Sequence, residues 1–278
     1  MQVYLYAKSG HTIGLEATKR CAAIANALKE FNPILCTSDF RAGAFAKENL
    51  EIKKYVNVDV IRNLPNIMER KDILIFDTNE VNEDMKQEMK QFCSILYDIS
   101  TDFNKIIVDT SIYKKNEDPT LEKTLFFGDD DYENLLVDYI KDKKNYEINL
   151  LMGHYFFLGN EKYFKNHFLN IIDEEEYVQT IKNSKYLLTS SLQAAFESIS
   201  CGNKPVLFKR NDKIYDEHLI SKLNLPLLTY SNFGELIENF NSTINNYPNL
   251  TNFETADLNN LAKEIKQKIE IFNKLTQL

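Results

Sequence analysis

The sequence lacks the cysteine patterns, long apolar runs and basic runs that are typical of several large classes of protein. Its four cysteines are widely scattered, without Cys-x-x-Cys spacing or nearby histidine pairs, which argues against a zinc site and against a disulfide framework. No apolar run reaches the roughly 18 residues of a transmembrane segment. No basic run could follow a phosphate backbone, and 33 Lys and Arg against 41 Asp and Glu give a net charge of -8. Nucleic acid is therefore not expected as a partner.

The N-terminal residues lack the pattern of an export signal. The opening MQVYLYAKSG contains no basic region followed by an apolar segment. We therefore expect a cytoplasmic protein. With 44% hydrophobic residues among 278, the chain can fill the core of one large domain or of two domains of ordinary size.

Short apolar runs alternate with longer stretches of helical period, which is typical of βαβ units and parallel sheets. In the first half, this alternation predicts strands and helices at these ranges: strands 2–7, 32–36, 73–77, 93–98 and 105–109; helices 14–30, 51–72 with a break near Pro65, and 82–92. In the second half, it predicts another set: strands 148–152, 186–189, 205–209 and 226–230; helices 173–183, 192–200, 216–223 and 257–272.

A charged segment, KDKKNY at 141–146, separates the two halves and is followed by a new apolar run. It predicts an N-terminal domain over 1–144 and a C-terminal domain over 145–278 that ends in a closing helix. Two successive α/β halves predict two Rossmann-like domains that face each other across a cleft. Ligands would then bind beyond the carboxyl ends of the strands.

The segment 189–208, TSSLQAAFESISCGNKPVLF, has the pattern of a binding site. Ser190 and Ser191 stand between a strand and a helix, where hydroxyls can cap the helix and donate to a phosphate. Glu197, about two turns later, can accept both hydroxyls of a ribose, and Gly202 ends the helix. The same residues also fit a plain helix cap followed by a carboxylate on a solvated face.

Two motifs carry a family resemblance. The run SKYLLTSSLQAAFESISCGNKPVLF resembles the nucleotide-sugar-binding segment of the MurG-type branch of the GT-B superfamily, in which a small-residue loop precedes a helical Glu and a Gly-x-Pro turn. The run KSGHTIGLEATKRCAAIANAL resembles the first loop and helix of the UDP-sugar hydrolase of pseudaminic acid biosynthesis (PseG-like). Looser matches, KDILIFDTNEV, CSILYDIS, KIIVDTSIY and LLMGHYF, follow that hydrolase's strand order, so the resemblance covers most of the chain.

The resemblance implies a GT-B protein that binds a UDP-linked sugar and hydrolyses or transfers it in surface-glycan or flagellin-glycan (nonulosonic acid type) biosynthesis, without metal or cofactor. The binding residues that we expect come from both halves: Ser9, Gly10, Gly14, Arg20, Gly153, His154, Ser190, Ser191, Leu192, Gln193 and Glu197.

Two residues of the first loop and helix are candidates for catalysis. His11 could act as a base from the loop, and Glu16 could activate water from the first helical turn if its pKa were raised. The alternatives are a polar surface histidine and a carboxylate that interacts with the helix dipole. Arg20 could neutralise a diphosphate, or it could be solvated.

The chain departs from the family pattern at several points. Ala17 stands where the hydrolase has its catalytic histidine, and Asp77 is not followed by the hydrolase's His-Tyr pair. Gly153-His154 and a bulky Tyr-Phe-Phe replace a Gly-Gly phosphate loop. The stretch 153–172 is short, which implies that the second domain has lost a βα unit. These departures favour an alternative: a catalytically degenerate GT-B relative that acts as a binding or assembly protein with a protein partner.

The acidic runs at 129–131 and 173–176 superficially resemble metal clusters. Neither run has the spacing or the partner histidine of a metal site, so we interpret them as a loop and a helix N-terminus. His167 and His218 belong to no constellation and are interpreted as structural.

Overall fold

The computed structural model describes residues 1–103, 105–141 and 145–276, and it has two compact units. Unit 1 consists of Met1–Ser9, Ala17–Asp109 and Glu254–Leu278, and unit 2 consists of Gly10–Glu16 and Thr110–Phe253. The predicted boundary after residue 144 lies in 142–144, outside the described residues. The stretch 110–141, which we expected in the first domain, has its contacts in unit 2, because it supplies a central strand of that unit's sheet.

Unit 1 is built on a five-stranded parallel sheet in the order β3-β2-β1-β4-β5. Its strands are β1 (Val3–Ala7), β2 (Ile34–Thr37), β3 (Tyr55–Asn57), β4 (Ile73–Asp77) and β5 (Ile95–Asp98). Its α-helices are α1 (Glu16–Ala27), whose first residue belongs to unit 2, α2 (Phe40–Asn49), α3 (Glu83–Phe92), α4 (Ile99–Asp102) and α11 (Leu258–Thr276). Two 3-10 turns, Lys29–Phe31 and Ile61–Asn66, complete it.

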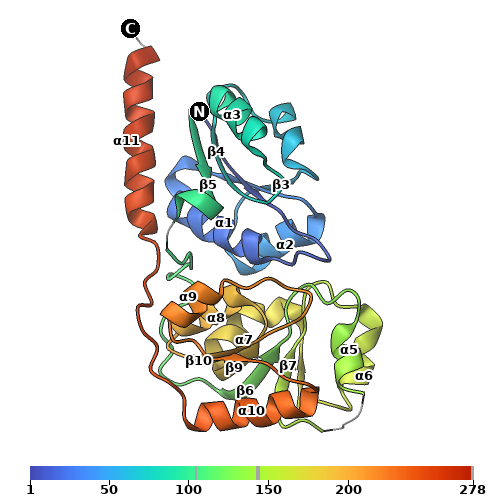
Figure 1. Ribbon diagram of the computed structural model, residues 1–278. Coiled ribbons are helices and arrows are strands. Elements are labelled where there is room, and N and C mark those ends of the chain that lie inside the picture. The colour runs from blue at the N-terminus through green and yellow to red at the C-terminus, as the bar shows by residue number, and fades with distance from the viewer. Residues whose placement is uncertain (104, 142–144, 277–278) are drawn as a thin grey trace. The chain divides into compact units, whose positions relative to one another are not determined.

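Helices lie on both faces of this sheet (Figure 1). On one face, Tyr4, Tyr6 and Phe76 pack against α3 and the turn at Ile61–Asn66. Because side chains alternate along a strand, the intervening residue Leu5 points to the other face, and it too is fully buried. Burial on both faces explains why these strands read as continuous apolar runs.

Unit 2 is built on a six-stranded parallel sheet in the order β11-β10-β9-β6-β7-β8. Its strands are β6 (Leu121–Phe126), β7 (Asn149–Leu151), β8 (Ile171–Ile172), β9 (Ser184–Thr189), β10 (Lys204–Phe208) and β11 (Leu227–Leu228). Its α-helices are α5 (Leu135–Tyr139), α6 (Glu161–Phe164), α7 (Tyr177–Asn183), α8 (Leu192–Ser200), α9 (Glu217–Lys222) and α10 (Phe233–Asn245), and it has 3-10 turns at Leu158–Asn160 and Glu174–Glu176.

The main core of unit 2 lies between the sheet and α10. Leu125, Leu188 and Val206 of the three central strands pack there with Phe233 and Phe240 of α10. On the opposite face, α7 and α8 cover the sheet (Figure 1). The core therefore fixes β6, β9 and β10 side by side, and with them the loops that follow.

Two parallel α/β sheets confirm the predicted fold class, and the prediction of α8 over 192–200 is confirmed to the residue. The predicted strand at 105–109 is wrong, since only Ile106 forms an isolated bridge, with Thr255. The predicted helix over 51–72 is also wrong, because β3 and a 3-10 turn occupy it. The βα unit that we expected to be lost is present in reduced form, as α6 and β8.

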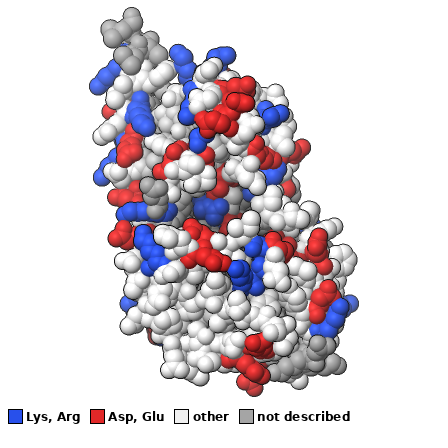
Figure 2. Space-filling view, in the orientation of Figure 1, with Lys and Arg blue, Asp and Glu red and all other residues white. Residues whose placement is uncertain are grey.

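Among the described residues on the face that Figure 2 shows, Lys and Arg side chains are interspersed with Asp and Glu. None of the helices in the described ranges combines the length and the apolar character that crossing a bilayer requires.

Candidate functional site

The candidate site lies where β6, β9 and β10 of unit 2 end. These three strands are neighbours and parallel, so the segments that follow them meet at one edge of the sheet. The segments are Phe127–Asp131 after β6, Ser190–Ser191 after β9 and Lys209–Lys213 after β10. In open α/β sheets, this edge is where ligands bind.

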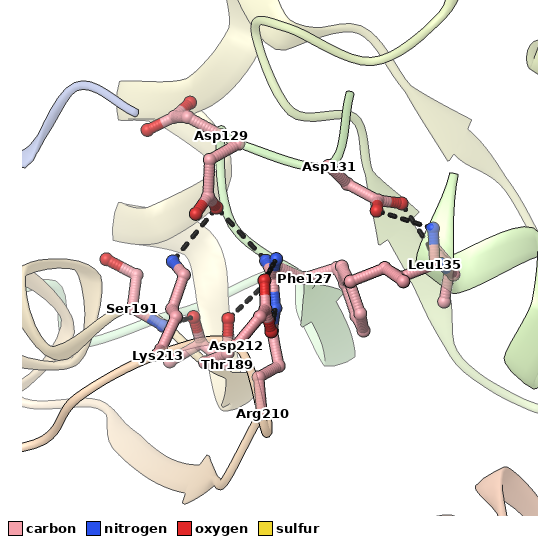
Figure 3. A network of polar contacts seen from close by, with 12 residues as sticks. Phe127, Asp129, Asp131, Leu135, Thr189, Ser191, Arg210, Asp212 and Lys213 are labelled. Carbon is pink, nitrogen blue, oxygen red and sulfur yellow. Dashed lines mark hydrogen bonds and ion pairs between the residues drawn. The ribbon is translucent and has the colours of Figure 1, made fainter. Parts of the chain in front are cut away.

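A buried arginine holds this edge together. Arg210, whose side chain is only 1% exposed, places Nη1 at 3.0 Å from Asp130 Oδ1 and Nε at 3.0 Å from Asp212 Oδ1. Lys213 Nζ lies 2.9 Å from the same oxygen of Asp130. Figure 3 shows Arg210, Asp212 and Lys213 converging with the loop that holds Asp129. Two cations thus share one buried carboxylate, which offsets the cost of burying the guanidinium.

The backbone carbonyl of Phe127 is a second junction. It accepts hydrogen bonds from the Ser190 hydroxyl and from Arg210 Nη1, the latter at 3.2 Å. The guanidinium also lies 4.6 Å from the centre of the Phe127 ring, within cation–π range. Ser190 therefore directs its proton at the protein backbone, and it helps to fix the loop after β6.

The helix α8 begins at this edge with a hydroxyl cap. Ser191 Oγ accepts a hydrogen bond of 3.1 Å from the amide of Ala194, which is the bond expected of an N-cap serine. The same hydroxyl donates to Glu16 Oε1 at 2.7 Å. A carboxylate at this position is favoured by the partial positive charge of a helix N-terminus. The start of α8 thus accommodates an anionic oxygen.

Glu197 lies within α8 and is only 1% exposed. Its Oε2 accepts a hydrogen bond of 2.7 Å from the Tyr177 hydroxyl, and its Oε1 accepts one of 3.1 Å from Gln193 Nε2. Burial and the Glu197 carboxylate raise the pKa of Tyr177 well above its ordinary value, so Tyr177 remains a proton donor. A ribose at Glu197 would have to compete with these two donors. Leu192, at the first turn of α8, is half-buried.

The loop Gly10–Glu16 has its contacts in unit 2. The His11 ring packs against Tyr132 and edge-on against Tyr155, with centroids 4.6 and 5.1 Å apart. Gly14 lies against the loop after β6, where an added Cβ would meet that of Asp129 at 3.4 Å. The structure therefore brings the predicted residues of this loop together with those of unit 2.

Gly153 and His154 follow β7 and touch the same loop. A Cβ on Gly153 would come within 2.1 Å of the Gly128 carbonyl oxygen, so only glycine fits there. The His154 amide donates to Asp129 Oδ1 at 3.4 Å. Tyr155 and Phe156, which are 1% and 5% exposed, fill the interior behind these residues.

Ser9 and Arg20 belong to unit 1. Ser9 Oγ donates to Asp39 at 2.6 Å, and Arg20 Nε lies 2.6 Å from Asp77 Oδ2. Both side chains lie at the carboxyl edge of the unit 1 sheet, since Ser9 follows β1 and Asp77 ends β4.

Sequence reasoning missed Asp130, Arg210 and Lys213. The run KRNDK directly after the strand of β10 was an available signal, because charged residues at the carboxyl end of a buried parallel strand face the ligand edge. The sequence predicts an ordinary loop for the aspartates at 129–131, because it does not predict the strand before them. Among the described residues, no group of three His, Cys, Asp or Glu side chains could hold a metal ion.

Asp131 has a different role from its neighbour. It is 2% exposed, and its two oxygens accept the backbone amides of Leu135 and Leu136 at 2.7 and 3.0 Å, at the start of α5. Burial raises the pKa of Asp131 to about 6, although these amides and Arg210 oppose the shift. Asp131 fixes the far end of the loop after β6.

No protein family model matches the chain, and no curated protein matches it. Among the solved structures that resemble it are two with bound uridine nucleotides. UDP-GlcNAc 2-epimerase of Methanocaldococcus jannaschii, in complex with UDP-GlcNAc and UDP, has a TM-score of 0.58 at 12% identity, covering 96% of this chain and 100% of that chain. Alr3699/HepE of Anabaena, in complex with UDP-glucose, has a TM-score of 0.51 at 11% identity, covering 100% of both chains.

Likeness at such low identity shows the fold. The chain has a two-domain Rossmann-like fold of the GT-B type. The narrower resemblance to the hydrolase of pseudaminic acid biosynthesis stays a prediction.

Proposed function

We propose that the protein binds a UDP-linked sugar at the carboxyl edge of the unit 2 sheet and hydrolyses it or transfers its sugar. The observation that carries this proposal is the carboxylate of Glu16 on the Ser191 hydroxyl at the start of α8. This position accepts an anionic oxygen, with a helix N-terminus and a capping hydroxyl as donors, which is the arrangement that a diphosphate requires.

The other residues of the edge have complementary tasks in this proposal. Lys213, whose side chain is 19% exposed, supplies a cation near the diphosphate, while the buried Arg210 holds the loop after β6 in place. Glu197 receives the ribose hydroxyls when they replace its present donors. The UDP-GlcNAc and UDP-glucose in the two similar structures support a uridine nucleotide as the first ligand to test.

The chemistry proposed for the site needs no metal. Departure of the sugar leaves negative charge on the diphosphate, and fixed donors at a helix N-terminus stabilise such charge without reorganising. His11 and Glu16 are the candidates for accepting a proton from water or from an acceptor hydroxyl. Gly10, Gly14, Gly153, His154, Gln193 and Leu192 would shape the pocket, and Ser9 and Arg20 would contact the acceptor. We place the reaction in cytoplasmic surface-glycan or flagellin-glycan synthesis, as the hydrolase resemblance implies.

One group of observations favours a second candidate, a degenerate GT-B relative that binds a partner protein. Tyr155 and Phe156 fill the interior beside Gly153, where the family has a small-residue phosphate loop. Glu197 is held by Tyr177 and Gln193, and Ala17 has no proton to transfer. Under this proposal, the carboxyl edge is retained as scaffold.

Calorimetric titration with UDP and UDP-GlcNAc separates the two candidates. Under the first, the protein binds UDP at micromolar concentration, and Glu197→Gln weakens binding about tenfold, since one charge-assisted hydrogen bond is lost. Glu238→Gln, on the exposed side of α10, is the matched control and should bind as the unmodified chain does. Absence of UDP binding at millimolar concentration would leave the second candidate. Release of UDP from UDP-GlcNAc with and without added acceptors then distinguishes transfer from hydrolysis.

A further inference from the structure

We propose that residues 10–16 form a self-inhibitory strap, in which the Glu16 carboxylate occupies the place at the start of α8 that a ligand phosphate needs. This inference rests on the proposed function, because it concerns how the same site is closed when no ligand is present. It predicts that nucleotide binding displaces Glu16.

The strap is a compact loop closed by its own backbone. The amides of Ile13 and Gly14 both donate to the carbonyl of Gly10, at 3.1 and 2.8 Å. Gly10 and Gly14 have φ values of +146° and +79°, which residues with a Cβ rarely adopt. The loop can therefore move as one preformed piece, because these internal hydrogen bonds do not depend on the rest of unit 2.

Two contacts seat the strap on unit 2. The His11 ring packs on the rings of Tyr132 and Tyr155, and His11 itself is exposed. Gly14 lies against the side chains of Asp129 and Asp130, where an added Cβ would meet theirs at 3.4 and 3.7 Å. Both of these contacts are packing contacts, one between aromatic rings and one between the Gly14 backbone and side-chain carbons.

The third contact is the latch. Ser191 has one hydroxyl proton, and that proton is donated to Glu16 Oε1. The hydroxyl cannot donate to Glu16 and to a phosphate at the same time. Two anionic groups at one helix N-terminus would also repel each other. A phosphate at Ser191 therefore requires Glu16 to leave, and Glu16, which is partly exposed, can be solvated when it does.

A latch of this kind lowers the apparent affinity for the ligand, because only the molecules whose latch is open can bind it. If the closed state exceeds the open state by about tenfold, the apparent dissociation constant for a nucleotide is about tenfold higher than that of the open site. Removing the negative charge of Glu16 should recover this factor. The effect has the opposite sign to that of an ordinary binding residue, whose loss weakens binding.

The test compares the full chain with Glu16→Gln and with Glu235→Gln. Glu235, like Glu16, is a glutamate in the first turn of a helix, and it belongs to α10 of unit 2. Its carboxylate accepts a hydrogen bond of 2.8 Å from the Ser231 amide, remote in sequence from the site segments. Glu16→Gln should bind UDP about tenfold more tightly in calorimetry, and Glu235→Gln should bind it unchanged. Unchanged or weaker binding of UDP by Glu16→Gln would overturn the strap while leaving the proposed function intact.

Amide hydrogen exchange supplies the second readout. Without UDP, exchange over 10–16 should be faster in Glu16→Gln than in the unmodified chain; equal exchange would overturn the latch. With UDP, the unmodified chain should exchange faster over 10–16 and more slowly at the start of α8. Protection of 10–16 by UDP would instead make the loop a clamp on the ligand and overturn the proposal. If no variant binds UDP, the proposed function fails, and the exchange comparison without UDP alone decides whether Glu16 holds the loop.

Discussion

The two units carry the same kind of sheet but build its carboxyl edge differently. In unit 1, water still reaches the charged pairs: Arg20 and Asp77 have side chains 27% and 12% exposed, and Lys8 and Glu80 have side chains 20% and 23% exposed. In unit 2, the side chain of Arg210 is 1% exposed and that of Asp130 is 6% exposed.

This difference indicates which edge is preorganised. A pair that water reaches can rearrange around a ligand at little cost, because solvent replaces each partner. A buried guanidinium with three protein acceptors cannot, since each bond that it loses leaves a desolvated charge. Unit 2 therefore holds the loops at its carboxyl edge in one geometry, whereas the charged side chains at the edge of unit 1 can rearrange.

We expect the largest effect from a substitution that breaks the ion-pair network of Arg210 in unit 2. Arg210→Met should lower the free energy of unfolding by about 3 to 5 kcal/mol, because it leaves Asp130 buried with one cation fewer and the Phe127 carbonyl with one donor fewer. Arg20→Met, the matched change in unit 1, should cost about 1 kcal/mol or less. Urea unfolding followed by circular dichroism measures both.

Equal losses for the two arginine variants would contradict the comparison. Asp212→Asn gives a graded check, since it keeps the shape of one Arg210 partner and removes its charge. The half-exposed Asp212 should contribute less than Asp130, and Asp130→Asn should be the more destabilising of the two.

A second prediction concerns pH, where the two units should respond with opposite sign. In unit 2, burial raises the pKa of Asp131 from 3.8 to about 6, so its ionisation destabilises the fold progressively as pH rises through that interval. In unit 1, burial alone would raise the pKa of Asp98, but hydrogen bonds from Lys86 and Ser100 outweigh it and lower that pKa. Asp98 thus stabilises the fold at neutral pH and loses this contribution in acid.

The measurement is unfolding of the unmodified chain, Asp131→Asn and Asp98→Asn at pH 4 and pH 7. Between pH 4 and pH 7, the free energy of unfolding of Asp131→Asn should rise by up to about 3 kcal/mol relative to that of the unmodified chain. This is the free energy of a shift of about two pKa units. Because the pKa of Asp98 lies below its ordinary value of 3.8, its contribution is nearly complete at pH 4. Asp98→Asn and the unmodified chain are therefore also compared at about pH 2, and Asp98→Asn should lose stability relative to the unmodified chain from there to pH 7. If stability changes equally with pH in all three proteins, Asp131 and Asp98 do not make contributions of opposite sign.

The sequence predicts local structure well where one segment decides it. Helix α8 is predicted to the residue because its cap Ser191, its apolar stripe and the Gly202 that follows it all lie in one short segment. Strand β6 is missed because Glu122 and Lys123 interrupt its apolar run, and this error moves the domain boundary. The strand predicted at 105–109 fails for the opposite reason: residues 106–109 are buried, but among the described residues their only β-pairing is the isolated bridge of Ile106 with Thr255.

The candidate site likewise has some residues that a local pattern predicts and others that it does not. Ser190, Ser191 and Glu197 follow from one strand, loop and helix, so a local pattern finds them. Arg210 and Asp130 are 80 residues apart in sequence, and only the pairing of β6, β9 and β10 brings them together. The contact between Glu197 and Tyr177 likewise depends on how α7 packs against α8, and the hydrophobic period of the sequence does not predict this packing.

We expect the smallest effect from substitutions that compare two helix caps of unit 2, one of them also a proposed binding residue. Ser191 caps α8 and Asn232 caps α10, each by accepting an amide hydrogen bond, at 3.1 and 3.0 Å. Changing either residue to alanine should cost about 1 kcal/mol of stability, as loss of an N-cap does. Ser191→Ala should also weaken UDP binding and loosen residues 10–16, whereas Asn232→Ala should do neither. If the two variants differ in neither binding nor exchange, the hydroxyl of Ser191 is only a cap, and the preorganised edge of unit 2 holds its own loops rather than a nucleotide.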